Sequence, residues 1–201
     1  MFKVYGDRFS GNCYKAKLLL SLLGRDFEWV DVDILKGESR TPEFLAMNPN
    51  GKVPVLEIEP GTWLGESNAI LCYLADGTPY LPDDRLARAR AFEWLFFEQY
   101  SHEPFIATSR YWIRYLGKAE EYRAQLDTKR PGGYAALGVM ERALAERDWL
   151  VAGAGRCTVA DIALYAYTHV AHEGGFDLAG FPVICAWLGR ITTLPGYASM
   201  E

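Results

Sequence analysis

Residues 51–59, GKVPVLEIE, form a strand-like stretch with a proline near its start. Branched apolar residues such as Val53, Val55 and Ile58 suit the pleated surface of a sheet. Pro54 has no N–H for a ladder bond, so it belongs at the first residue of a strand or on an edge. Two interpretations remain open. One is an ordinary trans proline, the more frequent isomer; the other is a cis Val53–Pro54 bond that turns the Val53 backbone toward a cleft.

Strand and helix patterns alternate around this stretch, and the Pro60-Gly61 pair predicts a tight turn after it. The order β-α-β-α-β-β-α indicates a small α/β layer domain over residues 1–78. The predicted strands lie at residues 2–5, 27–34, 54–59 and 62–64, and the predicted helices lie at 13–23, from 41 onward and at 66–74.

The second part of the chain lacks strand signals and carries long amphipathic segments at helical spacing. We therefore expect an all-α domain over residues 86–201. Pro104 should kink or end the first helical segment. Thr158 and Asp161 should form a capping box at the start of a later helix.

Composition narrows the function classes. Twenty-one basic and 26 acidic residues give a net charge of −5 without a basic stripe, which argues against nucleic acid as a partner. The sequence shows neither a signal-peptide pattern nor an apolar stretch of membrane-spanning length. The four cysteines form no Cys-x-x-Cys pair, so neither a metal site nor a disulfide framework is expected. We expect a cytoplasmic protein with no membrane partner.

Four features in this order and spacing resemble the cytosolic glutathione S-transferases. They are the Val53-Pro54 strand start, Gly65-Glu66-Ser67, Ser10-Gly-Asn-Cys13 and the Thr158–Asp161 box. The resemblance implies a thioredoxin-like N-terminal domain, an all-helical C-terminal domain, a homodimer and a cis-proline at Pro54. The segment around Ser10 is most similar to bacterial members with a Ser/Asn active site, of theta-like or Nu-like type.

The resemblance assigns glutathione, an extended peptide, to a site on the first domain. The backbone beside Pro54 would pair with the peptide through Val53, as in strand addition. Glu66 and Ser67 would hold its γ-glutamyl end at a helix N-terminus. The spacing of the residues alone favours a different interpretation, in which Ser67 is an N-cap and Glu66 a first-turn acid, and the resemblance reverses that preference.

Two cations are candidates for the glycyl carboxylate of glutathione. Lys52 lies where theta-like members carry a basic residue, and Arg40 is the weaker candidate. Either side chain can also be an ordinary solvated surface cation.

The chemistry of the family requires a glutathione thiolate. Ser10 and Asn12 stand just before the first predicted helix and are the candidate donors, with Ser10 ranked first. Cys13 offers a rival redox interpretation, because a cysteine at a helix N-terminus can itself be activated. Its dithiol partner position holds Ser10, however, so Cys13 is expected to point into the core.

The sequence thus predicts a glutathione transferase that uses glutathione as co-substrate, without a metal, against a small hydrophobic electrophile. The alternatives are a glutathione-dependent peroxidase or disulfide reductase, and a non-catalytic ligand-binding module of the same fold. The electrophile pocket is expected between the two domains. Its predicted lining is Phe9, Phe105, Ile106, Ser109, Trp112 and Tyr165.

Overall fold

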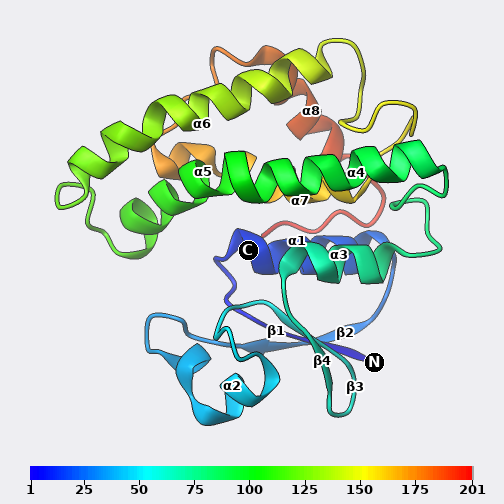
Figure 1. Cartoon of the computed structure of the whole chain (residues 1–201), viewed down its shortest axis with the longest axis vertical. Coiled ribbons are helices and arrows are strands. Elements are labelled where there is room, and N and C mark those ends of the chain that lie inside the picture. Colours follow the sequence, from blue (N-terminus) through cyan, green and yellow to red (C-terminus); the bar gives the residue numbers. More distant parts are fainter. Residues whose placement is uncertain (201) are drawn as a thin grey trace. The chain divides into compact units, whose positions relative to one another are not determined.

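The computed structural model describes residues 1–200 and divides the chain into two compact units. The first unit comprises residues 1–76 together with residues 194–200, and the second comprises Gly77–Thr193. All strands of the described chain lie in the first unit, and the second is built from helices (Figure 1). The expected fold, a thioredoxin-like domain followed by an all-helical domain, is confirmed.

The first unit contains a four-stranded mixed sheet in the order β2-β1-β3-β4. Strand β1 runs parallel to β2 and antiparallel to β3, and β3 forms a hairpin with β4. The predicted turn at Pro60-Gly61 connects this hairpin, and Gly61 adopts a φ of 84° there. The strands are β1 (Phe2–Gly6), β2 (Phe27–Asp31), β3 (Val55–Glu59) and β4 (Thr62–Leu64).

Helices α1 (Gly11–Leu22) and α3 (Ser67–Ala75) lie on one side of this sheet, and α2 (Pro42–Met47) lies on the other (Figure 1). Helix α1 buries Ala16 and Leu19, as their helical spacing predicts. Helices α1 and α3 pack against each other on this face, and their first turns are in contact.

The Val53–Pro54 peptide bond is cis. Strand β3 begins only at Val55, so the proline precedes the strand and no ladder bond is lost to it. The Val53 side chain packs against a small core cluster that contains Val32 and Phe44. This packing anchors the side chain of Val53, and the residue as a whole is half-buried.

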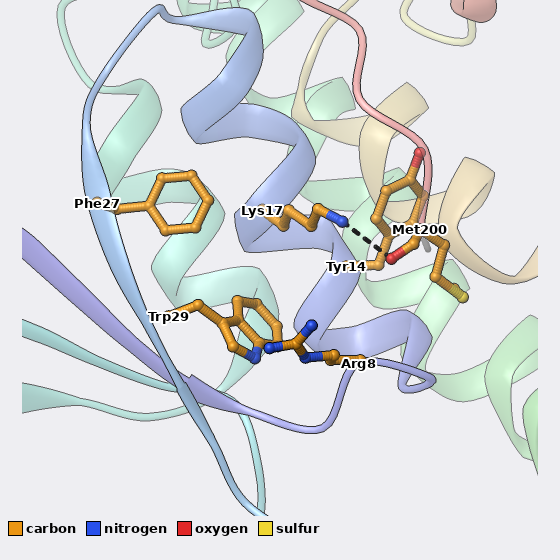
Figure 2. A pocket seen from close by; sticks show the side chains of 6 residues that line it. All are labelled: Arg8, Tyr14, Lys17, Phe27, Trp29 and Met200. Carbon is orange, nitrogen blue, oxygen red and sulfur yellow. Dashed lines mark hydrogen bonds between the residues drawn. The ribbon is translucent and has the colours of Figure 1, made fainter.

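The last described residues pack against α1. Tyr14 donates a hydrogen bond of 2.7 Å to the Ala198 carbonyl, and Lys17 donates one of 3.0 Å to the Met200 carbonyl. The helical domain expected over 86–201 included this tail, because its sequence carries no strand signal; its contacts instead group it with the first unit. The tail borders a cavity of about 180 Å³ lined by Arg8, Tyr14, Lys17, Phe27, Trp29 and Met200 (Figure 2).

The second unit contains helices joined by loops and has no strand within residues 77–193, all of which the structure describes. Helix α7 is its centre, since every residue of that helix is buried. The helices are α4 (Arg85–Phe97), α5 (Glu103–Arg110), α6 (Arg123–Leu144), α7 (Val159–Thr168) and α8 (Pro182–Thr192).

The first helical segment ends just before Pro104, as its position predicts, and Pro104 lies in the first turn of the next helix. A π-helical turn, Glu98–His102, joins α4 to α5, and Pro104 is the second residue of α5. Proline is tolerated there because N–H groups in the first turn have no intrahelical acceptor to lose.

Among residues 1–200, none of the helices combines the length and the apolar character that a membrane crossing requires.

Candidate functional site

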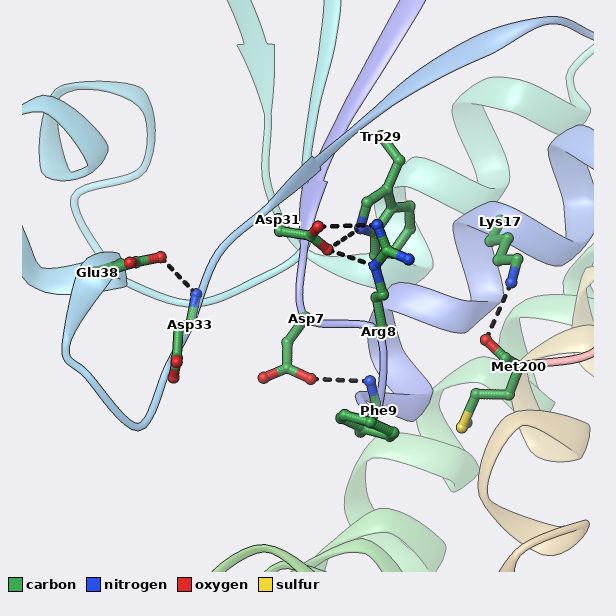
Figure 3. Close-up of polar contacts among 9 residues, drawn as sticks. All are labelled: Asp7, Arg8, Phe9, Lys17, Trp29, Asp31, Asp33, Glu38 and Met200. Atoms are coloured by element: carbon green, nitrogen blue, oxygen red, sulfur yellow. Dashed lines mark hydrogen bonds and ion pairs between the residues drawn. The ribbon is translucent and has the colours of Figure 1, made fainter.

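The loop before α1 is fixed by hydrogen bonds within itself and by an ion pair to β2, and these contacts position Ser10. The Asp7 carboxylate accepts the Phe9 N–H at 2.8 Å, and the Asp7 carbonyl accepts the Ser10 N–H at 3.1 Å. Next to them, Arg8 forms a two-point ion pair with Asp31 of β2 (Figure 3). These contacts tie the loop to the sheet edge and fix where α1 begins.

Ser10 is the N-cap of α1. Its Oγ accepts a hydrogen bond of 3.4 Å from the Cys13 N–H, and the residue is largely buried. A capping hydroxyl acts as acceptor, so its own proton stays available for donation to a second group. Ser10 can therefore cap the helix and donate to a bound thiolate at the same time.

Cys13 is fully buried, as expected of a core residue. Its side chain packs so closely on Gly6 that a Cβ added to the glycine would lie 3.0 Å from the sulfur. Burial raises the pKa of the Cys13 thiol to about 12, although a hydrogen bond with the Ser10 side chain opposes this shift. At neutral pH the thiol is protonated, which argues against Cys13 as a redox nucleophile.

Glu66 and Ser67 stand at the N-terminus of α3. Glu66 is the N-cap residue and has a φ of 60°, a conformation that non-glycine residues rarely adopt and that clusters at functional sites. Its carboxylate accepts a hydrogen bond of 3.4 Å from Asn50. Ser67 is the first helical residue, and no side chain caps α3. The interpretation of Ser67 as an N-cap is therefore wrong.

The first turns of α1 and α3 are joined through side chains. Ser67 Oγ donates to Asn12 Oδ1 at 3.1 Å. The ammonium of Lys15 donates to Ser67 Oγ and to Asn68 Oδ1, both at 3.2 Å. The structure thus brings together Asn12 and Ser67, beside Ser10 at the start of α1, in one polar cluster.

Sequence reasoning missed Lys15. A signal was available, because Lys15 lies three and four residues before the buried Leu18 and Leu19, on a face that helical spacing assigns to the core. A lysine on such a face needs polar partners, and these come from α3.

The loop before Val53 is braced by asparagine side chains, which were also missed. Asn48 donates to the Lys52 carbonyl at 2.8 Å and accepts the Asn50 N–H at 3.1 Å. Neither the N–H nor the C=O of Val53 forms a hydrogen bond within the described residues. The Asn48 side chain therefore fixes the loop, while the backbone N–H and C=O of Val53 stay without hydrogen bonds within the described residues.

Arg40 and Lys52 lie on this same loop region, and both are exposed. The Arg40 guanidinium donates to the Asn50 carbonyl at 3.1 Å. It lies over Gly51, which has a φ of 63° and where an added Cβ would stand 2.5 Å from that guanidinium. Lys52 forms no ion pair with any of residues 1–200.

The residues expected to line the electrophile pocket fall into two groups. Ile106, Ser109 and Tyr165 are almost fully buried within the helical unit, as core residues are. Phe105 and Trp112 are partly exposed and flank the ammonium of Lys129, which stands 5.6 and 5.5 Å from their ring centroids.

Phe9 belongs to the first unit, where 44% of its surface is exposed. Within residues 1–200, no three His, Cys, Asp or Glu side chains gather so as to hold a metal ion.

Two curated relatives and one longer protein show the family context. Disulfide-bond oxidoreductase YfcG of Escherichia coli K12 is 29% identical over 92% of this chain and 87% of its own length. Glutathione S-transferase GstA of Escherichia coli O157:H7 is 31% identical over 92% and 90%. Protein Ure2 of Eremothecium gossypii is 34% identical over 73% of this chain, which spans only 43% of that relative.

Solved structures of proteins with related names also resemble this chain in fold and sequence. A glutathione S-transferase from Pseudomonas fluorescens Pf-5 is 54% identical, with a TM-score of 0.96 over 99% of this chain and 98% of that one. Ure2p in complex with glutathione is 27% identical, with a TM-score of 0.85 over 97% and 90%.

Family models match both units. The glutathione S-transferase N-terminal domain matches residues 9–76, and the C-terminal domain of the same family matches residues 95–195. Together these two matches cover most of the chain, and the candidate site lies within the first of them. This protein belongs to the glutathione S-transferase family.

Proposed function

We propose that this protein is a glutathione transferase that activates the glutathione thiol with Ser10 and Asn12. The observation that carries the proposal is the 3.1 Å hydrogen bond from Ser67 to Asn12, which holds two helix N-termini together. Each helix N-terminus offers N–H donors and the positive end of a dipole. The N-terminus of α1 suits the thiolate, and the N-terminus of α3 suits the γ-glutamyl carboxylate.

Glutathione would lie along the first unit as an added strand. Its cysteinyl backbone would pair with the N–H and C=O of Val53, which have no partner in the described chain. Its γ-glutamyl amine would meet the Glu66 carboxylate, and its glycyl carboxylate would meet Lys52 or Arg40. The solved complexes of Ure2p with glutathione support a peptide site on this fold.

The available donors are sufficient to form a thiolate. A free thiol has a pKa of about 8.5, and lowering that pKa by about two units requires about 2.7 kcal/mol of preference for the anion. One hydrogen bond to a charged group contributes about 1.5–3 kcal/mol. A helix N-terminus adds about 0.3–1 kcal/mol. Ser10 or Asn12, together with α1, can supply this amount.

The thiolate would then attack a small hydrophobic electrophile, as the transferase relatives by name suggest. We propose Phe105 and Trp112 as lining residues, because their rings are partly exposed. Phe9 is proposed to contribute from the first unit, and Ile106, Ser109 and Tyr165 would support the lining from the core.

The relative named disulfide-bond oxidoreductase supports a second candidate function. In it, the glutathione sulfur itself would reduce a peroxide or a mixed disulfide. The protonated, buried state of Cys13 favours this route over one that uses a protein thiol.

Titration of bound glutathione, followed by thiolate absorbance, tests the proposal. The wild-type protein should be retained on immobilised glutathione and should lower the thiol pKa by about two units. Ser10→Ala should raise that pKa by about one to two units, because one charge-assisted hydrogen bond is lost. Asn12→Ala should raise it less if Ser10 is the main donor, and more if Asn12 is.

Cys13→Ala is the matched control, because it changes the sulfur beside Ser10 without removing a proposed donor. It should leave conjugation nearly unchanged. Loss of activity in Cys13→Ala with full activity in Ser10→Ala would contradict the proposal and indicate a cysteine-dependent redox protein. A panel of aryl halides, epoxides, peroxides and mixed disulfides then separates transferase from reductase.

A homodimer is part of the proposal. Phe92, Phe96 and Tyr100 recur at four-residue spacing along α4 and the turn after it, and Phe96 is 74% exposed. A stripe of exposed aromatic residues suits an isologous contact between two copies. Phe96→Glu should therefore convert a dimer, measured by sedimentation, into a monomer; an unchanged dimer would exclude this stripe.

A further inference from the structure

The cavity beside the C-terminal tail has no role in the proposed function. Its volume is about 180 Å³, and its lining comes from the loop before α1, from α1, from β2 and from the tail, all within the first unit (Figure 2). At about 100° per residue, its α1 residues, Tyr14 and Lys17, lie on the face of α1 opposite to the one that contacts α3. Asn12 and Lys15 make those α3 contacts. The cavity therefore lies on the other side of α1 from the candidate glutathione site.

The walls of this cavity are mainly apolar. Phe27 and Trp29 are two residues apart in β2, so both rings point to the same side of the sheet, toward α1 (Figure 2). The ring of Tyr14 and the side chain of Met200 complete the apolar lining. An engineered apolar cavity of about 150 Å³ binds benzene. A volume of about 180 Å³ is therefore sufficient for one aromatic ring with a small substituent.

Asp31 fixes two of the lining side chains. Its carboxylate accepts hydrogen bonds from Arg8 Nε and Nη2, at 2.7 and 2.9 Å, and from Trp29 Nε1 at 2.8 Å (Figure 3). The third guanidinium nitrogen, Arg8 Nη1, has no hydrogen-bond partner among residues 1–200. The structure thus holds an indole ring and a guanidinium with spare donors at the cavity, and such pre-organisation reduces the cost of binding.

Lys17 supplies a second cation, and no carboxylate of residues 1–200 forms an ion pair with it. Its Nζ donates one hydrogen bond, of 3.0 Å, to the Met200 carbonyl, although an ammonium group can donate three. Partial burial, and then the positive charge of Arg8, lower the pKa of Lys17. The described lining therefore contains two cations and no acid, and only the neighbouring Asp31 balances one of them.

We propose that this cavity is a binding site for a small aromatic carboxylate. The ring would lie against Phe27 and Trp29, and the carboxylate would accept hydrogen bonds from Lys17 and Arg8. An inorganic anion would leave the apolar walls without a partner, and a neutral ring would leave the ammonium without an acceptor. The inference goes beyond the proposed function, because it assigns a second ligand to the opposite face of α1.

Titration of the wild-type protein with benzoate, without glutathione, tests the site. The indole N–H signal of Trp29 in a ¹⁵N–¹H spectrum is assigned by its loss in Trp29→Phe. This signal should shift with a Kd of about 1 mM or lower. Acetate and inorganic phosphate lack the ring, and benzyl alcohol lacks the charge, so each should bind at least about tenfold more weakly. An unmoved Trp29 signal at about 10 mM benzoate, or equal affinity for acetate and benzoate, would overturn the proposal.

Lys17→Met tests the position of the carboxylate, because methionine keeps the apolar stem and removes the charge. It should weaken benzoate binding about tenfold or more, since a hydrogen bond to a charged group is lost. Lys17→Arg keeps a cation and should bind benzoate within about threefold of the wild-type protein. Unchanged affinity in Lys17→Met would overturn the proposal. An equal loss in Lys17→Arg would also overturn it, because packing rather than charge would then be responsible.

Lys36→Met is the matched control for net charge. Lys36 belongs to the same unit, pairs with Asp33 at 2.9 Å and does not line the cavity. Its replacement removes the same charge as Lys17→Met and should leave benzoate affinity unchanged. An equal loss in both variants would show that the overall charge of the protein attracts benzoate, and would overturn a defined site.

Competition with glutathione separates the two ligand sites. Benzoate bound on the β2 side of α1 should remain bound when glutathione is added, and the Trp29 signal should keep its shifted position. Displacement of benzoate by glutathione would place both ligands in one site and would overturn the proposal. Because the benzoate titration needs no glutathione, its failure would leave the proposed function intact, and a protein that binds benzoate but not glutathione would contradict only the proposed function.

Discussion

The N-termini of α7 and α3 differ in how their free N–H groups and positive dipole end are satisfied. In α7, the buried Asp161 carboxylate accepts hydrogen bonds from the Leu150 and Thr158 N–H groups, each at 2.9 Å, and from Trp187 Nε1 at 3.0 Å. Thr158 caps the Ala160 N–H, so the predicted capping box is confirmed. The chain supplies its own anion to this helix end.

Helix α3 carries no acidic residue in its first turn and no side-chain cap. A buried cation, Lys15, lies beside it instead. An end with positive dipole and positive side chain favours an external anion, whereas an end filled by Asp161 has no place for one. The difference teaches that the α7 end is completed from within the chain, whereas the α3 end has the charge and the uncapped N–H groups that suit an external anion.

The largest expected effect is on stability at α7. Asp161→Asn should lower the free energy of unfolding by about 3 kcal/mol or more, because an amide NH₂ would face buried N–H donors in either orientation. The urea midpoint measures this change. Asp148→Asn, at an exposed carboxylate paired with Arg190, is the control and should change it by less than about 0.5 kcal/mol. Equal stability of both variants would remove the distinction between the two helix ends.

A smaller effect is expected on binding at α3. Glu66→Gln should raise the KM for glutathione about tenfold, or ~1.4 kcal/mol, with little change in turnover at saturating glutathione. The γ-glutamyl end that Glu66 is proposed to hold is the same in the ground and transition states, so loss of this contact should affect both equally. Glutamine keeps the backbone at Glu66 unchanged.

Glu59→Gln, at an exposed acid of β3, is the control and should leave KM unchanged. A fall in turnover without a change in KM would place Glu66 at the reacting sulfur, and would weaken the view of α3 as a binding end.

The smallest effect is expected at the other end of α7. Burial lowers the pKa of His169, the C-cap residue, below its usual 6.5, although a hydrogen bond to the Tyr165 carbonyl opposes the shift. The unfolded chain then binds a proton more readily than the folded one, so stability should fall as the pH drops below about 6.5. Urea midpoints at pH 7.5 and 5.5 measure this loss.

His169→Phe keeps a ring that can stack on Tyr165, as the imidazole does at 4.6 Å, and should reduce the pH dependence. An identical pH dependence in this variant would assign it to other groups.

Much of the fold could be predicted because its signals are local. The Pro60-Gly61 turn, the proline at the head of β3 and the Thr158–Asp161 box each depend on residues within a few positions of one another. The alternation of strands and helices follows in the same way from hydrophobic period. The π-helical turn before Pro104 was missed, since it depends on how α4 and α5 pack with their neighbours in the helical unit.

The candidate site also combines features that local sequence predicts with features that depend on tertiary packing. The sequence by itself determined the residue types at the helix starts, namely Ser10, Asn12, Glu66 and Ser67. Only the tertiary structure decided that Ser67 meets Asn12, 55 positions away, and Lys15, 52 positions away. Period and propensity describe which face of an element is buried, but not which polar atom of another element it meets. Those meetings follow from the packing of α1 beside α3 on one sheet face.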